Sequence, residues 1–88
     1  MQEVVHAGER IPAAQLLVRL GRRISKLRQD RRWTRHHLAR RLGVPITRLG
    51  DWERGSCQPP LPMLLELGRC LEVSVEELAL GGETANDE

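Results

Sequence analysis

The sequence predicts an all-α fold, a compact bundle of five helices, and two observations point to it. Apolar residues recur at intervals of three and four along much of the 88-residue chain, which is the spacing of one helix face. Aromatic residues are almost absent, with two Trp and no Phe or Tyr, so the core must be built from Leu, Ile and Val. A chain of this length forms one domain with a small core and no catalytic cleft between lobes, so we expect no enzyme.

The first helix is expected to follow an N-terminal arm. Residues 1–11 show no hydrophobic periodicity and contain Gly8, which is typical of an arm. Pro12 begins the domain proper, residues 12–81, and suits the first turn of a helix, where a missing N–H costs nothing. Four apolar residues follow at helical spacing: Leu16, Leu20, Ile24 and Leu27. They predict an amphipathic helix that runs to about Arg31.

Two short helices are expected next, packed across a tight turn. Thr34 is a good N-cap for a helix over residues 35–42, and Trp33 before it can pack back on that helix as a hydrophobic staple. Gly43 lies where the turn needs a positive φ angle. A third helix is expected over about 45–54.

The apolar pattern of these two helices separates inward from outward side chains. Pro45 fits only the first turn of the third helix, and Gly55 can take the left-handed conformation after its end. The inward set is Leu38, Leu42, Val44, Leu49 and Trp52. The outward set is Arg35, Ile46, Thr47, Arg48 and Asp51. Two helices arranged in this way form a helix-turn-helix.

The rest of the chain is expected to close the core with two more helices. A loop by composition leads to Pro62, near the start of a fourth helix. The apolar set of that helix is Met63, Leu64, Leu67 and Leu71. Ser74 and Glu77 have the spacing of a capping box and predict a short fifth helix over residues 75–80. Residues 82–88 are expected to form a disordered acidic tail.

The charges are distributed unevenly along the chain. Residues 19–41 carry ten Lys or Arg and one acid, whereas residues 66–88 carry seven acids and one base. Charged residues often do no more than solvate exposed helix faces, but this basic run overlaps the first half of the helix-turn-helix. The overlap favours contact with a polyanion such as nucleic acid.

Other classes of site have little support in the sequence. Cys57 and Cys70 stand alone, without the paired spacing of a metal site or disulfide framework, and we expect free thiols. His36 and His37 are adjacent on a helix and cannot easily face one ion, so we expect neither a metal nor another cofactor. No apolar run approaches the roughly 20 residues that span a bilayer. No secretory pattern occurs either, so we expect a cytoplasmic protein without a membrane partner.

Four motifs occur in a fixed order between about residues 20 and 80. They read ISKLR at 24–28, LARRLGV at 38–44, WERG at 52–55 with Pro59 beyond, and LLEL at 64–67 leading to Leu71 and Val73. This ordered set resembles the Xre or Cro-and-repressor family of helix-turn-helix proteins. The resemblance implies a lambda-repressor-like fold, whose third helix is a recognition helix that lies in the major groove of double-stranded DNA.

The resemblance also implies which residues contact bases. Ile46 and Thr47 occupy the first turn of the recognition helix, and Asp51 lies one turn further along. Arg48 faces outward and can reach the backbone or a guanine edge. A carboxylate in the groove is repelled by phosphates, so Asp51 is useful only if it accepts from a cytosine amino group or neutralises Arg48. Gly50 costs roughly 1 kcal/mol of helix stability but lets the backbone approach DNA closely.

Two further roles follow from the resemblance. Arg35 and Arg54 are placed to contact phosphates, and the free N–H groups at the start of the second helix support the role of Arg35. The family usually has Gln at the position of Arg35, which leaves open whether this side chain also braces the recognition helix. Arg28 and Glu53 are expected to form a structural ion pair behind the DNA-facing surface.

Two hypotheses of function remain at this point. The first is a sequence-specific DNA-binding transcriptional regulator that acts as a homodimer, because one copy offers few DNA contacts. The fifth helix with the tail is the first candidate for the pairing surface, and the arm with Val4 and Val5 is the second. The alternative is a protein-interaction module, antitoxin-like or an adaptor, that keeps the fold and holds an acidic protein partner on its basic face.

Overall fold

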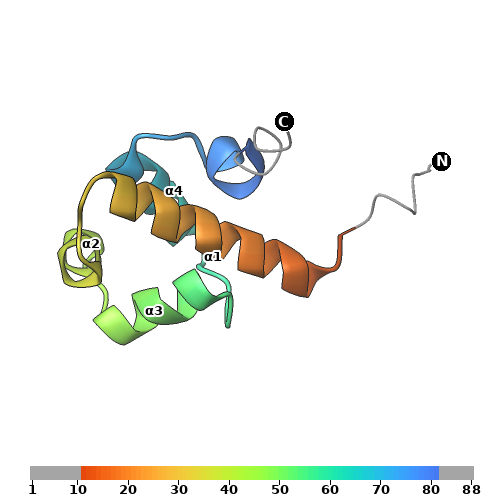
Figure 1. Ribbon diagram of the computed structural model, residues 1–88, viewed down its shortest axis with the longest axis horizontal. Helices are drawn as coiled ribbons and strands as arrows, with labels where there is room; N and C mark the ends of the chain where they lie inside the picture. The colour runs from red at the N-terminus through yellow and green to blue at the C-terminus, as the bar shows by residue number, and fades with distance from the viewer. Residues whose placement is uncertain (1–10, 82–88) are drawn as a thin grey trace.

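The longest element, α1 (Ala13–Asp30), runs through the middle of the domain in the computed structural model, and the other elements pack around it (Figure 1). The structure describes residues 11–81. The remaining elements are α2 (Arg35–Leu42), α3 (Ile46–Arg54), α4 (Leu61–Leu71) and the π-helical segment η3 (Glu77–Gly81). The predicted all-α fold is confirmed, since the described range contains no strand. The expected tail, residues 82–88, and the expected arm, apart from Ile11, lie outside that range.

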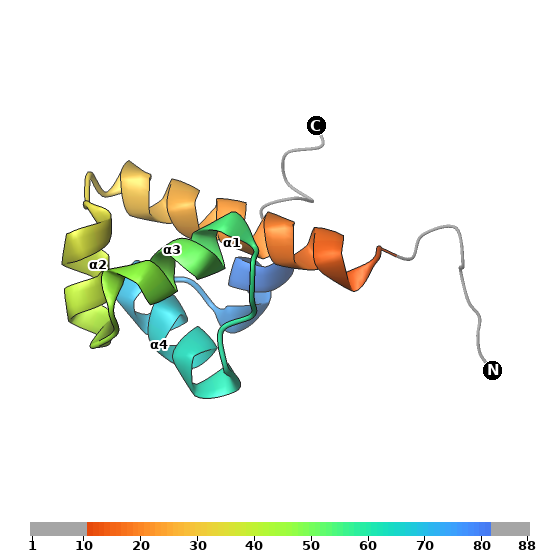
Figure 2. The same cartoon turned by 90° about the horizontal axis from the view of Figure 1, so that it is seen from below.

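Helices α1 and α3 lie side by side (Figure 1, Figure 2), and Gly21 permits their close approach. A Cβ atom on Gly21 would lie 2.4 Å from the carbonyl oxygen of Glu53 and 2.5 Å from that of Trp52. No side chain fits between backbones at that distance. By helix propensity alone, Gly21 would be expected to weaken α1. In the packed fold it instead sets the distance between α1 and α3.

The core is aliphatic, as predicted. Eleven apolar residues are buried: Leu20, Ile24, Leu27, Leu38, Ala39, Leu42, Leu49, Trp52, Leu67, Leu71 and Leu78. Leu16 shares the helical spacing of the α1 residues in this set but is 40% exposed, so the apolar stripe of α1 is not buried over its whole length. The first turns of α1 extend past α3 (Figure 1), and periodicity cannot tell where a neighbouring helix stops covering a face.

The ends of α2 and α3 form largely as predicted. The Oγ1 atom of Thr34 accepts a hydrogen bond from the backbone N–H of His37 at 3.0 Å, which caps α2. Gly43 and Gly55 both follow their helices in the left-handed conformation, with φ angles of 74° and 77°. Pro45 differs from the prediction: it is the extended N-cap of α3 instead of a residue in the first turn.

The last element is not the α-helix that the sequence predicts for residues 75–80. The Oγ atom of Ser74 does accept a hydrogen bond from the backbone N–H of Glu77 at 2.9 Å, as the capping box requires. The Glu77 carboxylate, however, faces Arg23 of α1 at 3.6 Å, and the chain continues as the π-helical η3. Leu78, which follows Glu77, is fully buried in the core, so this segment is held by contacts with the rest of the domain as well as by its own hydrogen bonds.

Candidate nucleic-acid interface

One side of α3 is buried against the domain and the opposite side is open. Leu49 and Trp52 belong to the core, whereas Thr47 and Arg48 are exposed. Ile46, which the sequence places among the outward residues, is partly buried and packs against the core. It lies at the edge of the apolar stripe, where the two faces of a helix meet and the pattern alone cannot assign a side. The open face of α3 is therefore more polar than the sequence suggested.

Behind α3, Arg28 and Glu53 form a buried ion pair. Arg28 donates from Nε to Glu53 Oε2 at 2.7 Å and from Nη2 to Oε1 at 3.1 Å. Its Nη1 atom donates to the backbone carbonyl of Trp33 at 2.7 Å. The Glu53 side chain is 1% exposed. Because a buried charge must be paired and hydrogen-bonded, this contact joins α1, α3 and the α1–α2 turn.

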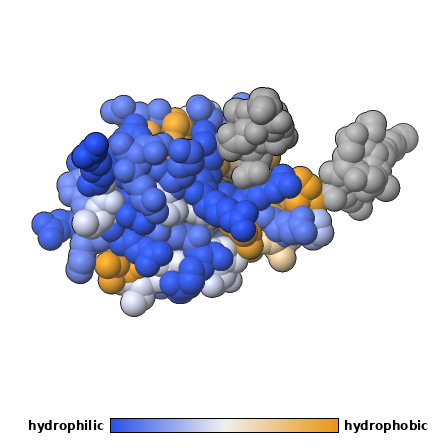
Figure 3. All heavy atoms as spheres, viewed as in Figure 1, coloured by the Kyte–Doolittle hydropathy of each residue, from blue (hydrophilic) through white to orange (hydrophobic). Residues whose placement is uncertain are grey.

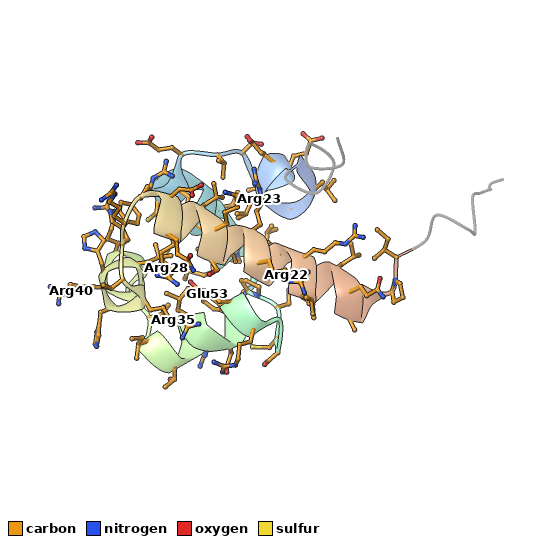
Figure 4. The ribbon with its side chains drawn as sticks, viewed as in Figure 1. Arg22, Arg23, Arg28, Arg35, Arg40 and Glu53 are labelled. Atoms are coloured by element: carbon orange, nitrogen blue, oxygen red, sulfur yellow. The ribbon has the colours of Figure 1, made fainter. Side chains whose placement is uncertain are left out.

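A second arginine shares the same carboxylate. Arg35 of α2 donates from Nε to Glu53 Oε1 at 2.9 Å, and its side chain is 44% exposed. Figure 4 shows Arg28, Arg35 and Glu53 converging between α1, α2 and α3. The sequence predicts a phosphate contact for Arg35 but gives no sign of its hydrogen bond to Glu53. The one hint in the sequence was that Arg35 stands where the family usually has Gln. The sequence pattern does not indicate which residue Arg35 would contact. Two cations on one anion leave a net positive charge at the start of α2.

The open face of α3 carries an ion pair of its own. Arg54 donates from Nη2 to Asp51 Oδ1 at 2.5 Å, with both side chains partly exposed. The sequence left two uses open for Asp51, and one of them, neutralising Arg48, is wrong, because its ion-pair partner is Arg54. Positions three residues apart on a helix are neighbours in either direction, so the pattern leaves the choice open. Arg48 has no ion-pair partner within residues 11–81.

Basic residues that received no role also border this region. Arg22 and Lys26 of α1 line a shallow polar depression beside Glu53. Arg40 of α2 is exposed and points away from α3 (Figure 4). These residues belong to the basic stretch at 19–41, but the sequence of that stretch does not show which of its side chains face α3. The face in Figure 3, which includes this part of the molecule, is mostly hydrophilic.

The cysteines and histidines form no site in the described part of the chain. Cys57 is exposed, and Cys70 is partly buried against the core. Within residues 11–81, no group of three His, Cys, Asp or Glu side chains is placed to hold a metal ion. None of the helices in that range combines the length and the apolar character needed to cross a membrane.

Comparisons with known proteins agree with this architecture. A family model described as a helix-turn-helix domain matches residues 19–80. The chain is 34% identical over 59 residues to the uncharacterised HTH-type transcriptional regulator YazB of Bacillus subtilis (strain 168), a match that covers 67% of this chain and 86% of that protein.

Two solved structures are also similar. The restriction-modification controller protein C.AhdI from Aeromonas hydrophila is 31% identical with a TM-score of 0.67, over 70% of this chain and 94% of that chain. The hypothetical transcription factor NHTF from Neisseria has a TM-score of 0.75 at 23% identity, over 89% of this chain and 91% of that chain. At this identity the similarity is evidence for the fold and not for a function. Since the family model spans most of the sequence, the chain belongs to the helix-turn-helix domain family, of the Xre or Cro-and-repressor type that its motifs resemble.

Proposed function

We propose that the protein is a sequence-specific DNA-binding transcriptional regulator that inserts α3 into the major groove of double-stranded DNA. The observation that carries the proposal is the open polar face of α3, backed by a side that is buried in the core. An α-helix fits the major groove, where each base pair presents its own set of donors and acceptors. The relatives support this function, because YazB is described as a transcriptional regulator and C.AhdI as a controller protein.

Four residues of α3 are proposed to contact bases. Arg48 is exposed and unpaired within the described residues, so its guanidinium is available for two hydrogen bonds to a guanine edge. Thr47 offers a hydroxyl that can donate or accept. Asp51 offers an acceptor for a base amino group. Ile46, which is partly buried, is left with an apolar contact to a thymine methyl group.

Arg35 is proposed to bind a phosphate. Its bond to Glu53 uses Nε, so the two terminal nitrogens of the guanidinium are left for an anion. Arg35 is also the first residue of α2, where free backbone N–H groups and the helix dipole favour the same anion. The hydrogen bond to Glu53 supports this role, because the buried carboxylate holds the arginine and so pre-orients its guanidinium.

Two copies are proposed to act together on a two-fold DNA site. An apolar groove of about 260 Å³ lies between the first turns of α1, α4 and η3, with Leu16, Leu64 and Leu80 in its wall. None of its lining residues comes from α3, so pairing there leaves both recognition helices open. None of the residues that line the groove is charged, so two copies can meet there without the repulsion between like charges that the basic residues of α1 and α2 would cause. Ala79 and Leu80 of η3 line this groove, and the fifth helix was part of the first pairing surface that we expected from the sequence.

The experiment that tests the proposal is selection of bound fragments from random duplex DNA, followed by a salt series on the recovered site. We expect one preferred sequence and an association constant that falls steeply as salt rises, because several phosphates are contacted. A protein with both Thr47→Ala and Arg48→Ala should keep its helical content and lose the preference at the base pairs that these two residues contact. Absence of duplex binding, or equal binding to all sequences, would refute the proposal and favour the protein-interaction module.

A further inference from the structure

Gly50, Asp51 and Arg54 form one structural unit on the open face of α3. Arg54 folds back toward the start of the helix to reach Asp51, which is the direction that helical side chains favour. On its way it passes over Gly50: a Cβ atom there would lie 3.1 Å from Arg54 Nη1 and 3.9 Å from Cζ. The glycine leaves the space in which the guanidinium lies.

The pairing changes what Asp51 can do next to DNA. A bare carboxylate would be repelled by the phosphates on both sides of the groove, whereas an ion pair with a guanidinium is neutral. Arg54 occupies Oδ1, and no other group in residues 11–81 bonds that carboxylate, so Oδ2 is left as an acceptor. An acceptor held in one orientation can receive a hydrogen bond from a base amino group, best from cytosine N4.

We infer that Arg54 is a positioning residue: it neutralises and orients Asp51, and Asp51 then reads the amino group of one cytosine. This inference rests on the proposed function, since it names which residue of α3 reads which base chemistry. It replaces the phosphate role that the sequence suggested for Arg54. It also explains why a glycine is present at position 50: the absence of a side chain leaves space for the Arg54 guanidinium, and close approach of DNA is not needed to explain it.

The two roles of Arg54 differ in a measurable way. A phosphate ligand contributes to all sequences alike, and its removal makes the salt slope shallower by about one. A positioning residue acts through Asp51, so its removal relaxes the preference at one base pair, and any general loss of affinity comes from the uncovered Asp51 carboxylate and disappears when Asp51 is also replaced by Asn.

The test compares Arg54→Ala, Asp51→Asn and the double variant, each by selection from random duplexes and by a salt series on the wild-type site. We expect Arg54→Ala and Asp51→Asn to lower discrimination at the same base pair, each by about tenfold. The double variant should be no worse than either single one, because both remove the same contact. Arg48→Ala is the matched control, an exposed arginine of the same helix, and should affect a different base pair.

Gly50→Ala provides a second test that keeps both charged groups. Alanine favours the helix, so the melting temperature should not fall. Its Cβ would lie 3.1 Å from Arg54 Nη1, so the guanidinium must shift by a few tenths of an ångström, and we expect a small drop in discrimination at the Asp51 base pair, less than in Arg54→Ala. If Gly50→Ala discriminates at this base pair as well as the wild type does, the space above Gly50 is not needed to position Arg54.

The inference and the proposed function fail in different ways. If no variant and no wild-type protein selects a sequence, the proposed function is wrong. If the wild type selects a site, but Arg54→Ala keeps the preference and flattens the salt slope by about one, Arg54 is a phosphate ligand and the inference is overturned.

Discussion

Glu53 of α3 accepts a hydrogen bond from Arg35 of α2 at 2.9 Å, although its carboxylate is buried and already bound by Arg28. The two arginines are not equivalent. Arg28 is nearly buried and bridges three parts of the fold, whereas Arg35 is 44% exposed at the edge of the proposed DNA interface. Removal of the first should affect stability, and removal of the second should affect DNA binding.

Arg28→Ala is expected to lower the free energy of unfolding by about 3 kcal/mol, because it leaves a buried carboxylate with one partially exposed partner. Urea unfolding followed by circular dichroism measures this. Arg22→Ala, at an exposed arginine on the same helix, is the control and should change stability by less than about 0.5 kcal/mol. Equal stability of the two variants would show that the buried pair does not hold the fold.

Arg35→Gln restores the residue that the family usually has and should change stability by less than about 1 kcal/mol, since the lost ion pair is half-exposed. DNA binding should weaken for all sequences, with a salt slope shallower by about one. Arg40→Gln is the matched control, because Arg40 is exposed on the same helix and points away from α3 (Figure 4). A changed base preference with an unchanged slope would argue against phosphate contact.

Gly21→Ala and Gly43→Ala should both destabilise the fold, for different reasons. At Gly21 the new Cβ meets backbone at 2.4 Å, so α1 and α3 must separate, which we expect to cost about 3 kcal/mol or more. At Gly43 a Cβ meets nothing within 4 Å, and only the left-handed backbone is strained, by roughly 1–2 kcal/mol. In thermal unfolding, Gly21→Ala should have a lower melting temperature than Gly43→Ala. The reverse order would contradict the close packing of α1 against α3.

Leu16→Ser tests the groove as the pairing surface. The substitution removes a large apolar side chain from each copy of a symmetric interface, so we expect the dimer dissociation constant to rise more than about tenfold. Sedimentation over a concentration series measures it. Leu61→Ser is the control, because Leu61 is 64% exposed but does not line the groove. If both variants associate like the wild type, the groove is not the interface.

Local features were predictable from the sequence. The bounds of α2, the cap at Thr34 and the left-handed Gly43 and Gly55 all follow from chemistry within a few residues. The aliphatic core followed from helical periodicity and from the scarcity of aromatic residues. Apart from Ile46, the side of α3 that faces outward also followed, because one turn of helix fixes which residues share a face.

Partners and boundaries were decided by tertiary structure. Whether Leu16 is covered, whether Ile46 lies inside or outside, and whether the last element is α or π depend on where a neighbouring helix lies. The bond between Arg35 and Glu53 joins residues 18 positions apart on different helices, and no local pattern encodes it. The sequence by itself determined which helices form and which faces are apolar, since both depend on near neighbours along the chain. Apart from the Arg28–Glu53 pair, which the family resemblance implied, only the packed fold decided which charges pair, because that choice depends on distances that exist only after the helices come together.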